Sequence, residues 1–395
     1  MFTQQKGNSV MVFGLGEVGS SVLHLLARQE GVSEIIACDK REDVGSVITE
    51  RVATAAGNQG YCKKMKFERC DVFDIDATAE LINKYNPGII YSGLVLLSWK
   101  WPKLLPSEQS AQTEKMIATL LPGHMILIYK LMQAVKKSGC TPICIQNSMP
   151  DIINPILQKC GLGVLTGAGN VDSVAAQIKR RISVEEKVPM KDVIVYLIME
   201  HAIGGMGTRN NGTNIPYFIK VMIGDKDITK KYNLDSYIDN YHLNRVSWQT
   251  RADGSSGKIE TIIPISVLAA SSAVHVISAI FNDTNEFFHS PGPNGLIGGY
   301  PVRISAKGVK IELPQEITME EAIKINVEAA KHEGLKEIKD DGTIVVTDEA
   351  YKITKSILGF DCREIRPEDI EQWAKQLVTT FQKLGVKYGF KAPIY

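Results

Sequence analysis

The feature that most restricts the fold of this chain is a glycine-rich turn between a short apolar run and a helical pattern. The apolar run covers residues 10–13, and the helical pattern covers residues 20–28. Between them the glycines of GLGEVG are spaced as G-x-G-x-x-G, at Gly14, Gly16 and Gly19. The first glycine of such a turn permits a tight bend, the second lets a ligand approach the backbone, and the third permits close helix–strand packing. This order predicts the first βα unit of a doubly wound α/β domain.

Strand-like and helix-like segments continue to alternate through the first half of the chain. Further strands are predicted at residues 34–39, 67–72, 88–92 and 141–146, and helices at residues 76–84 and 125–138. Short segments rich in glycine and proline separate them. The alternation predicts a parallel sheet covered by helices over residues 1–165, which is a Rossmann-type dinucleotide-binding domain if the glycine turn is its ligand site.

The pattern changes after about residue 165. Strands are predicted at residues 193–198, 258–263 and 301–311, and long helices at residues 266–281, 319–333 and 367–384. This mixture predicts an α+β catalytic or substrate domain over residues 166–395 that ends in a helical extension. The 395 residues of the chain suit two domains of ordinary size.

Composition indicates a globular protein without a strongly charged surface. The 45 basic and 44 acidic side chains leave a net charge of +1, so neither a nucleic acid nor an anionic membrane is expected as a partner. The seven cysteines form no CxxC pair, which is typical of free thiols in a reducing compartment. The N-terminus has no signal-peptide pattern. The most apolar stretch, residues 262–281, contains Pro264 and His275, which favours a buried helix over a membrane span. We therefore expect a cytoplasmic protein.

An acidic residue lies where a dinucleotide cofactor would require it. Asp39 ends the second predicted strand, twenty residues after Gly19, and can accept a hydrogen bond from the 2′-hydroxyl of a ribose. The same carboxylate would repel a 2′-phosphate, so NAD is favoured over NADP, although Lys40 and Arg41 directly after it reduce this preference. The predicted cofactor-binding residues are Gly14, Gly16, Glu17, Val18, Gly19, Asp39, Ser92 and Gly93. The alternative is a glycine-rich turn that binds no ligand.

Three later motifs occur in a recognisable order. Asn147 ends a predicted strand before a proline-containing turn, Asp172 lies in GAGNVDS, and His201 lies in LIMEHAIGG. In these motifs the chain resembles the lactate/malate dehydrogenase superfamily over roughly residues 10–333. The resemblance implies an NAD-dependent enzyme in which His201 is the general acid/base, Asp172 orients it and Asn147 hydrogen-bonds the substrate oxygen. It also implies a homo-oligomer, either a dimer or a tetramer.

The residue types fit this chemistry. An imidazole titrates near neutral pH and can accept a hydroxyl proton, while a carboxylate on its other nitrogen fixes the tautomer. Each residue also has a purely structural interpretation. Asp172 could be a helix N-cap, and His201 could be a packed histidine at the end of a strand.

The chain departs from the resemblance where a substrate carboxylate would bind. The family has an arginine three residues after the aspartate, and this chain has Ala175 there, which cannot form a bidentate ion pair. The stretch that corresponds to the family's mobile loop contains Lys100 and Lys103 but no arginine. Arg209, in a glycine-rich segment after His201, is a candidate replacement, and the alternative is an ordinary surface loop. Oxidation of lactate or malate itself is therefore not expected.

Three functions remain open from the sequence. The first is an NAD-dependent oxidoreductase acting on a secondary alcohol of a polar small molecule, either a sugar or polyol or a larger hydroxy acid. The second is an NAD- and metal-dependent glycosidase or lyase similar to the family 4 glycosidases, which share the two-domain plan and a Gly/Pro-rich stretch like residues 289–315. Those enzymes hold their metal with cysteine and histidine, and no cysteine flanks Asp172 or His201, so no metal site is predicted. The third is a non-catalytic NAD-binding protein, with which Ala175 is compatible.

Overall fold

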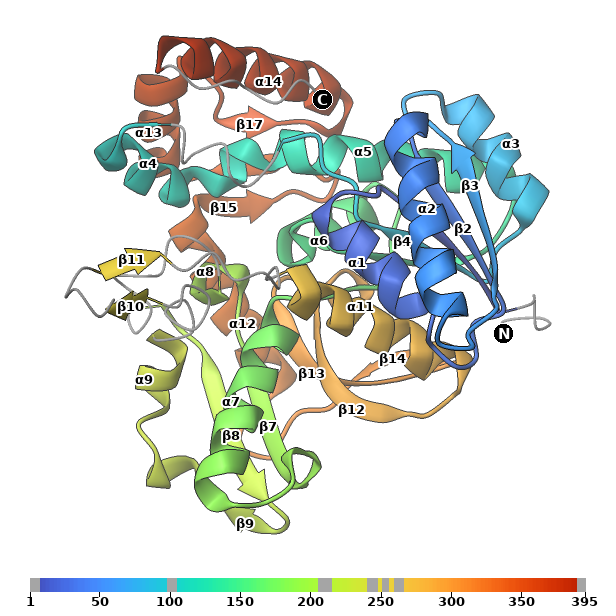
Figure 1. The fold of residues 1–395 in the computed structure, drawn as a ribbon. Coiled ribbons are helices and arrows are strands. Elements are labelled where there is room, and N and C mark those ends of the chain that lie inside the picture. The colour runs from blue at the N-terminus through green and yellow to red at the C-terminus, as the bar shows by residue number, and fades with distance from the viewer. Residues whose placement is uncertain are drawn as a thin grey trace.

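The first half of the chain forms a six-stranded parallel sheet (Figure 1). The structure is a computed structural model, and it describes residues 8–97, 105–204, 215–239, 248–250, 256–258 and 266–388. The strands are β1 (Ser9–Phe13), β2 (Glu34–Asp39), β3 (Lys64–Arg69), β4 (Ile89–Ser92), β5 (Ile143–Gln146) and β6 (Thr166–Gly167). Their order in the sheet is β3-β2-β1-β4-β5-β6, which is the doubly wound order of dinucleotide-binding domains. The predicted α/β fold is confirmed.

Helices connect these strands. They are α1 (Glu17–Leu26), α2 (Glu42–Gly57), α3 (Ile75–Tyr85), α4 (Ser107–Thr113), α5 (Ile117–Ser138) and α6 (Pro150–Lys159), with the 3₁₀ turn η2 (Glu114–Met116) before α5. The helix predicted at residues 125–138 begins earlier, at Ile117, and continues through Pro122. The side chains of its first turns are mostly apolar and buried. The free energy gained by burying them outweighs the loss of the backbone hydrogen bond that a proline cannot donate.

Both faces of the sheet are buried at β1, β2 and β4, which explains why these strands are nearly continuous apolar runs. Side chains alternate along each strand. Met11 and Phe13 of β1 pack in one core with α3 and α5, whereas Val10 and Val12 pack in a second core with α1 and with α11 (Ser266–Phe281). Helix α11 comes from the second half of the chain and packs directly on α1. The two halves are therefore joined through a continuous apolar core.

Among the described residues, and besides a third such sheet in the C-terminal segment, the second half contains two three-stranded antiparallel sheets. One has β7 (Val193–Ile198), β8 (Phe218–Ile223) and β9 (Lys226–Asp227), and the other has β12 (Glu286–Pro291), β13 (Gly299–Ser305) and β14 (Gly308–Ile311). The strand predicted at residues 301–311 is thus a hairpin, and Gly308, with a φ of 111°, permits its turn. A short pair, β10 (Trp248–Thr250) and β11 (Ser256–Lys258), is also present, and the rest of the strand predicted at residues 258–263 lies outside the described residues.

The helices of the second half cover these sheets (Figure 1). They are α7 (Val171–Glu186), α8 (His201–Gly204), α9 (Leu234–Asp239), α11 and α12 (Met319–Ala330). The 3₁₀ turns are η3 (Met190–Asp192), η6 (Thr229–Lys231), η7 (Pro293–Gly295), η8 (Lys331–Glu333) and η9 (Pro367–Asp369). No described helix has the length and apolarity needed to cross a membrane.

The C-terminal segment returns to the first half of the chain. It contains β15 (Leu335–Ile338), β16 (Ile344–Val346), α13 (Asp348–Leu358), β17 (Glu364–Ile365) and α14 (Ile370–Lys387). Helix α14 lies along α5 (Figure 1), and Leu377 and Phe381 share a core with Leu131 of α5. The sequence placed this segment in the second domain, and it placed the boundary at residue 165, just before β6 completes the parallel sheet. Neither the packing of α14 on α5 nor the pairing of β6 with β5 can be recognised from a local sequence pattern, because each joins residues far apart in the chain.

Candidate active site

The glycine turn after β1 has the geometry of close helix–strand packing. Gly14 has a φ of 87°, a conformation that glycine adopts without strain. A Cβ on Gly19 would lie 1.8 Å from the carbonyl oxygen of Gly14, so no larger residue fits there. A Cβ on Gly16 would have no atom within 4 Å. The fold therefore requires Gly14 and Gly19, whereas the space beside Gly16 leaves room for a ligand at the backbone.

Helix α1 begins directly after this turn, with Gly16 as its N-cap. Glu17 is exposed and Val18 is half-buried. The first N–H groups of a helix have no carbonyl partner within it, so this end is suited to an anion such as a phosphate.

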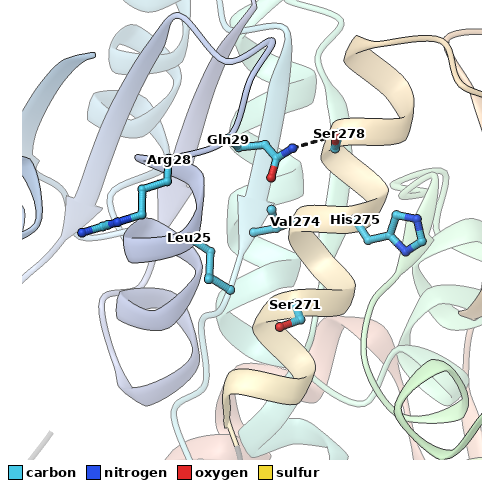
Figure 2. Close-up of a pocket in the computed structure, with 7 residues that line it drawn as sticks. All are labelled: Leu25, Arg28, Gln29, Ser271, Val274, His275 and Ser278. Atoms are coloured by element: carbon cyan, nitrogen blue, oxygen red, sulfur yellow. Dashed lines mark hydrogen bonds between the residues drawn. The ribbon is translucent and has the colours of Figure 1, made fainter. Parts of the chain in front are cut away.

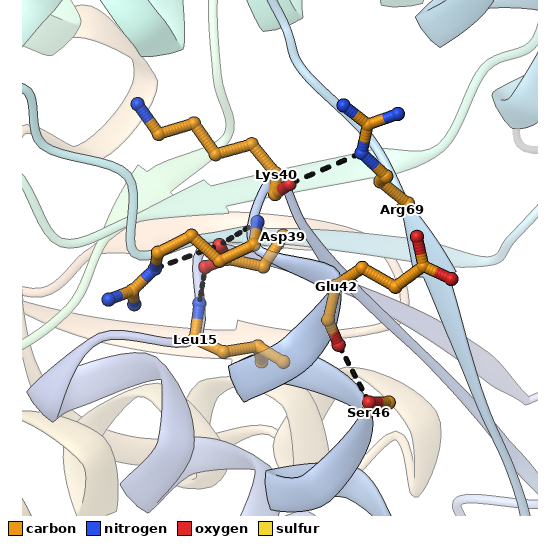
Figure 3. Close-up of polar contacts among 7 residues, drawn as sticks. Leu15, Asp39, Lys40, Glu42, Ser46 and Arg69 are labelled. Carbon is orange, nitrogen blue, oxygen red and sulfur yellow. Dashed lines mark hydrogen bonds and ion pairs between the residues drawn. The ribbon is translucent and has the colours of Figure 1, made fainter.

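Asp39 is hydrogen-bonded to the glycine turn (Figure 3). Its Oδ2 accepts a hydrogen bond from the Leu15 amide at 2.8 Å, and its Oδ1 accepts one from the Arg41 amide at 2.9 Å. The carboxylate is 11% exposed. Two backbone donors therefore hold the Asp39 carboxylate beside the turn, while part of it still faces solvent.

A basic side chain contacts this carboxylate: the Arg41 Nε lies 3.5 Å from Asp39 Oδ1. The Arg69 Nε donates to the Lys40 carbonyl at 3.4 Å (Figure 3). The charge that would repel a 2′-phosphate is thus paired with a cation, and the preference for NAD over NADP stays a prediction.

The strand ends of β4 and β5 lie next to the glycine turn. The Gly93 amide donates to the Phe13 carbonyl at 2.9 Å, and the Asn147 amide donates to the Ser92 carbonyl at 3.1 Å. The Asn147 side-chain nitrogen donates to the Ala168 carbonyl at 3.0 Å. Its Oδ1 is buried without a hydrogen-bond partner. Asn147 therefore presents an acceptor at the carboxyl edge of the sheet, where ligands bind in folds of this type.

His201 is the first residue of α8 and follows the end of β7 by three residues. Its Nδ1 lies 2.6 Å from Oε1 of Glu333 in η8. The imidazole is 23% exposed, whereas the Glu333 side chain is 4% exposed. A largely buried carboxylate thus holds one nitrogen of a partly accessible imidazole.

The sequence predicted Asp172 as the partner of His201, and the structure gives the imidazole a different carboxylate. Asp172 Oδ1 accepts a hydrogen bond from the His289 amide at 3.4 Å. Desolvation raises the pKa of the Asp172 carboxyl, while the Ser272 hydroxyl and the charges of His275 and Lys179 lower it. These partners belong to α7, α11 and β12. The contacts of Asp172 therefore connect α7 to its neighbouring elements.

Asn170, two residues before Asp172 in the same turn, contacts the carboxyl group of Asp151. Asn170, the N-cap of α7, has a φ of 46° and donates from Nδ2 to Oδ2 of Asp151 at 2.8 Å. Side chains two residues apart in a helix point in very different directions, so Asn170 and Asp172 face different elements. Ala175, at the position of the family's arginine, is 1% exposed and packs in the core around α7 and β7.

Three buried carboxyl groups lie around His201. Asp151 is the second residue of α6, Glu200 separates β7 from α8, and Glu333 ends η8. Their exposed fractions are 0%, 0% and 3%. The Asp151 backbone oxygen accepts from the Gly298 amide, and Glu200 Oε2 accepts from the Ala202 amide at 2.7 Å. One side-chain oxygen of each of the three carboxyl groups has no partner.

These carboxyl groups influence one another. Burial raises the pKa of Asp151 to about 6, with a further increase from Glu333 and opposing effects of His201 and Asn170. Burial also raises the pKa of Glu200 well above its ordinary value, and the charges of Glu333 and Asp151 raise it further. A site whose acids have perturbed pKa values is a candidate for proton transfer or ligand binding.

A second imidazole lies close to this group. His124 of α5 is 8% exposed, and burial followed by the charge of His201 lowers its pKa to about 4. It is therefore neutral near pH 7. Its backbone oxygen accepts a hydrogen bond from the Ser148 hydroxyl at 3.1 Å, which ties α5 to the turn after β5.

The remaining predicted site residues, Lys100, Lys103 and Arg209, lie outside the described residues. Within the described ranges, no group of three or more His, Cys, Asp or Glu side chains is arranged to hold a metal ion. A separate surface pocket of about 410 Å³ lies between α1 and α11 (Figure 2). There Gln29 donates to Ser278 at 3.0 Å. None of the predicted site residues lines it.

The Asp151→Asn change is expected to alter how stability depends on pH. The folded pKa of about 6 exceeds the ordinary value of 3.8, so the folded state binds this proton more tightly than the unfolded chain does. The contribution to stability is fully present below about pH 4 and is lost as the pH rises through about 6. At about 1.4 kcal/mol per pKa unit, the wild type should lose roughly 2–3 kcal/mol relative to Asp151→Asn. Urea unfolding from about pH 4.5 to about pH 7 measures this difference.

The control for this experiment is Asp225→Asn, which changes an exposed aspartate in the turn between β8 and β9. Its stability should follow the wild type at every pH. Parallel curves for the wild type and Asp151→Asn would mean that Asp151 titrates alike in the folded and unfolded states.

Comparison with known proteins places this geometry in a known fold. No protein-family model matches the sequence, and no curated protein matches it. The malate dehydrogenase from Picrophilus torridus in its apo form aligns with a TM-score of 0.58 and 18% identity, covering 85% of this chain and 98% of that one. The lactate dehydrogenase from Cryptosporidium parvum, complexed with lactic acid and NAD, aligns with a TM-score of 0.57 and 14% identity over 84% and 96% of the two chains.

A third solved structure covers still more of this chain. The lactate dehydrogenase from Eimeria maxima with NADH and oxamate aligns with a TM-score of 0.57 and 14% identity, over 91% of this chain and 98% of that one. The chain therefore has the fold of the lactate and malate dehydrogenases. The resemblance inferred from its short motifs is confirmed at the level of the fold.

Proposed function

We propose that this protein is an NAD-dependent oxidoreductase that interconverts a secondary alcohol and a ketone on a polar small molecule. The observation that carries the proposal is the imidazole of His201, held at 2.6 Å by the nearly buried Glu333. In the same fold, a glycine turn with open space beside Gly16 follows β1. Such a reaction needs a proton acceptor and a binding site for the dinucleotide cofactor.

The residues at the carboxyl edge of the sheet fit the cofactor. Gly16 leaves room for a pyrophosphate at the start of α1, and the partly exposed Asp39 carboxylate can accept a ribose hydroxyl. Ser92 and Gly93 follow β4 and lie next to the turn. When bound, the nicotinamide supplies the acceptor for a hydride. The enzymes from Cryptosporidium parvum and Eimeria maxima, which share the fold, bind NAD and NADH respectively.

His201 accepts the hydroxyl proton in this proposal. With the bound nicotinamide taking up the hydride from the alcohol carbon, the hydroxyl proton would pass to the imidazole, and the alcohol would become a ketone. Glu333 fixes the tautomer through Nδ1 and stabilises the imidazolium that forms. The Asn147 Oδ1, which has no hydrogen-bond partner among the described residues, is an acceptor for a second donor of the substrate.

The Gly16→Val variant tests the cofactor site separately from the chemistry. Because the space beside Gly16 is open, the side chain should fit the fold and occupy the position of the pyrophosphate. We expect the Kd for NADH to rise at least about tenfold, which corresponds to about 1.4 kcal/mol. Fluorescence titration with NADH measures this change. Gly57→Val is the matched control, since a Cβ there also meets no atom within 4 Å. Equal NADH affinity in the two variants, at equal Tm, would place the cofactor elsewhere.

Formation of NADH from NAD and a polar secondary alcohol tests the function itself. Net NADH formation supports a dehydrogenase. Tight NADH binding without turnover on a broad panel of alcohols would leave a non-catalytic binding protein, and glycoside cleavage without net NADH would indicate chemistry of the family 4 glycosidase type.

A further inference from the structure

Five buried polar atoms of the candidate site have no hydrogen-bond partner among the described residues, and all are oxygens that can accept a hydrogen bond. They are Asp151 Oδ1, Glu200 Oε1, Glu333 Oε2 and Asn326 Oδ1, together with Asn147 Oδ1 at the edge of the sheet. A buried acceptor without a donor costs roughly 1–3 kcal/mol, so such atoms are uncommon unless a ligand or another group completes them. A group of five acceptors indicates a ligand that is rich in donors.

Asn326 provides an observation that is independent of the acids. It is fully buried on α12, seven residues before Glu333, which places the two on the same side of a continuous helical segment. Its Nδ2 donates to the Gly299 carbonyl at 3.3 Å, which orients the amide and leaves Oδ1 unpaired. A neutral amide oxygen cannot be satisfied by a proton shared between carboxyl groups. It needs a donor that the described residues do not supply.

The charges around His201 also favour a ligand that supplies hydrogen-bond donors. The groups that most affect the Asp151 and Glu200 carboxyls are His201, which is one cation at most, and the other carboxyls of the cluster. Within the described chain, neither set of effects includes a lysine or an arginine. Ala175 packs in the core where the related enzymes have a carboxylate-binding arginine. Among the described residues, a substrate carboxylate would therefore meet acidic groups and no guanidinium.

We propose that the substrate carries a protonated amino group near its hydroxyl-bearing carbon, and that Asp151, Glu200 and Glu333 bind this ammonium. This inference rests on the proposed function. An ammonium has three N–H donors, which matches the three unpaired carboxyl oxygens. Its charge also compensates buried acids that a neutral hydroxyl, with a single donor, would leave uncompensated. The preferred substrate is then an amino alcohol, rather than the polyol or larger hydroxy acid expected from the sequence.

Three small alcohols that share one reacting centre test the inference. They are 1-amino-2-propanol, 1,2-propanediol and lactate, which carry an ammonium, a hydroxyl and a carboxylate next to the same secondary alcohol. With the intact protein and NAD, kcat/KM for NADH formation should be at least about tenfold higher for the amine than for the diol, and lowest for lactate. The rise in Tm that each compound causes at saturating NAD provides a readout that does not depend on turnover.

Two variants connect this preference to the acids. Asp151→Asn and Glu200→Gln preserve shape and remove charge, and each should reduce the ratio of amine to diol kcat/KM at least about tenfold. Glu328→Gln is the control on α12, because Glu328 is exposed and pairs with Lys331. It should keep the wild-type ratio. If one buried variant fails to fold, the other still tests the assignment.

The outcomes separate this inference from the proposed function. Faster NADH formation from lactate or from the diol overturns the ammonium site and leaves the oxidoreductase standing. A Tm rise specific to the amine that Asp151→Asn abolishes, without any NADH, supports the ammonium site and contradicts the oxidoreductase for these alcohols. If the amine shows no preference in turnover and causes no specific rise in Tm, the ammonium site is overturned.

Discussion

Replacement of His201 by asparagine is expected to lower kcat for alcohol oxidation by about a hundredfold to ten-thousandfold. The imidazole is the proposed acceptor of the hydroxyl proton, and asparagine cannot accept it near pH 7. The Kd for NADH should stay within about twofold, since the proposed cofactor-binding residues lie at the ends of β1, β2 and β4. Steady-state NADH formation and fluorescence titration with NADH measure the two effects separately.

His332→Asn is the control for this prediction. His332 is exposed and lies directly before Glu333 in η8, so its replacement changes a histidine in the same segment without touching the proposed chemistry. Its kcat should equal that of the wild type. Unchanged turnover in His201→Asn would remove His201 from the mechanism altogether.

The Glu333→Gln variant should lower kcat by about a hundredfold or more, and Asp172→Asn should change it by less than about threefold. Glu333 holds Nδ1 of the imidazole at 2.6 Å, whereas the Asp172 carboxylate accepts from the His289 amide. A nearby carboxylate stabilises the protonated imidazole and raises its pKa, so its removal should lower that pKa. The limb of the kcat/KM profile that reports this pKa should therefore move to lower pH in Glu333→Gln. A loss of packing alone would not produce this movement.

The opposite result has a clear meaning. Loss of activity in Asp172→Asn with normal activity in Glu333→Gln would restore the pair inferred from the motif order. Because both variants replace a carboxyl group with an amide of similar size, the comparison controls for the loss of a buried charge. Equal folding of the two variants is checked by urea unfolding.

Much of the first domain is predictable because its signals are local. Each strand needs only a short apolar run, and the turn after β1 needs glycines at fixed spacing. The conformation of Gly14 and the 1.8 Å approach at Gly19 leave no alternative residue. Asp39 is predictable for the same reason, since its position at the end of β2 determines its contact with the turn.

The set of side chains that meet around His201 cannot be predicted from local sequence patterns. Glu333 lies 132 residues after His201, in a stretch that reads as the end of an ordinary helix. Asp151 and His124 also occur in helical patterns that give no sign of an active site. Their meeting depends on how α5, α6 and α12 pack against the end of β7, and helix packing leaves little trace in a single sequence.

Asp172 and Asn170 show what a sequence motif alone does not predict. The motif predicted a glycine turn before α7, and the structure has one there, with Gly169 at a φ of 85°. Which side chain of the turn reaches Asp151 depends on backbone angles, and Asn170, at a φ of 46°, makes that contact. Short-range chemistry therefore determined the sheet, the glycine turn and the position of a histidine after β7. Long-range packing determined which carboxyl groups surround that histidine, because it sets both the direction of each side chain and the burial that shifts its pKa.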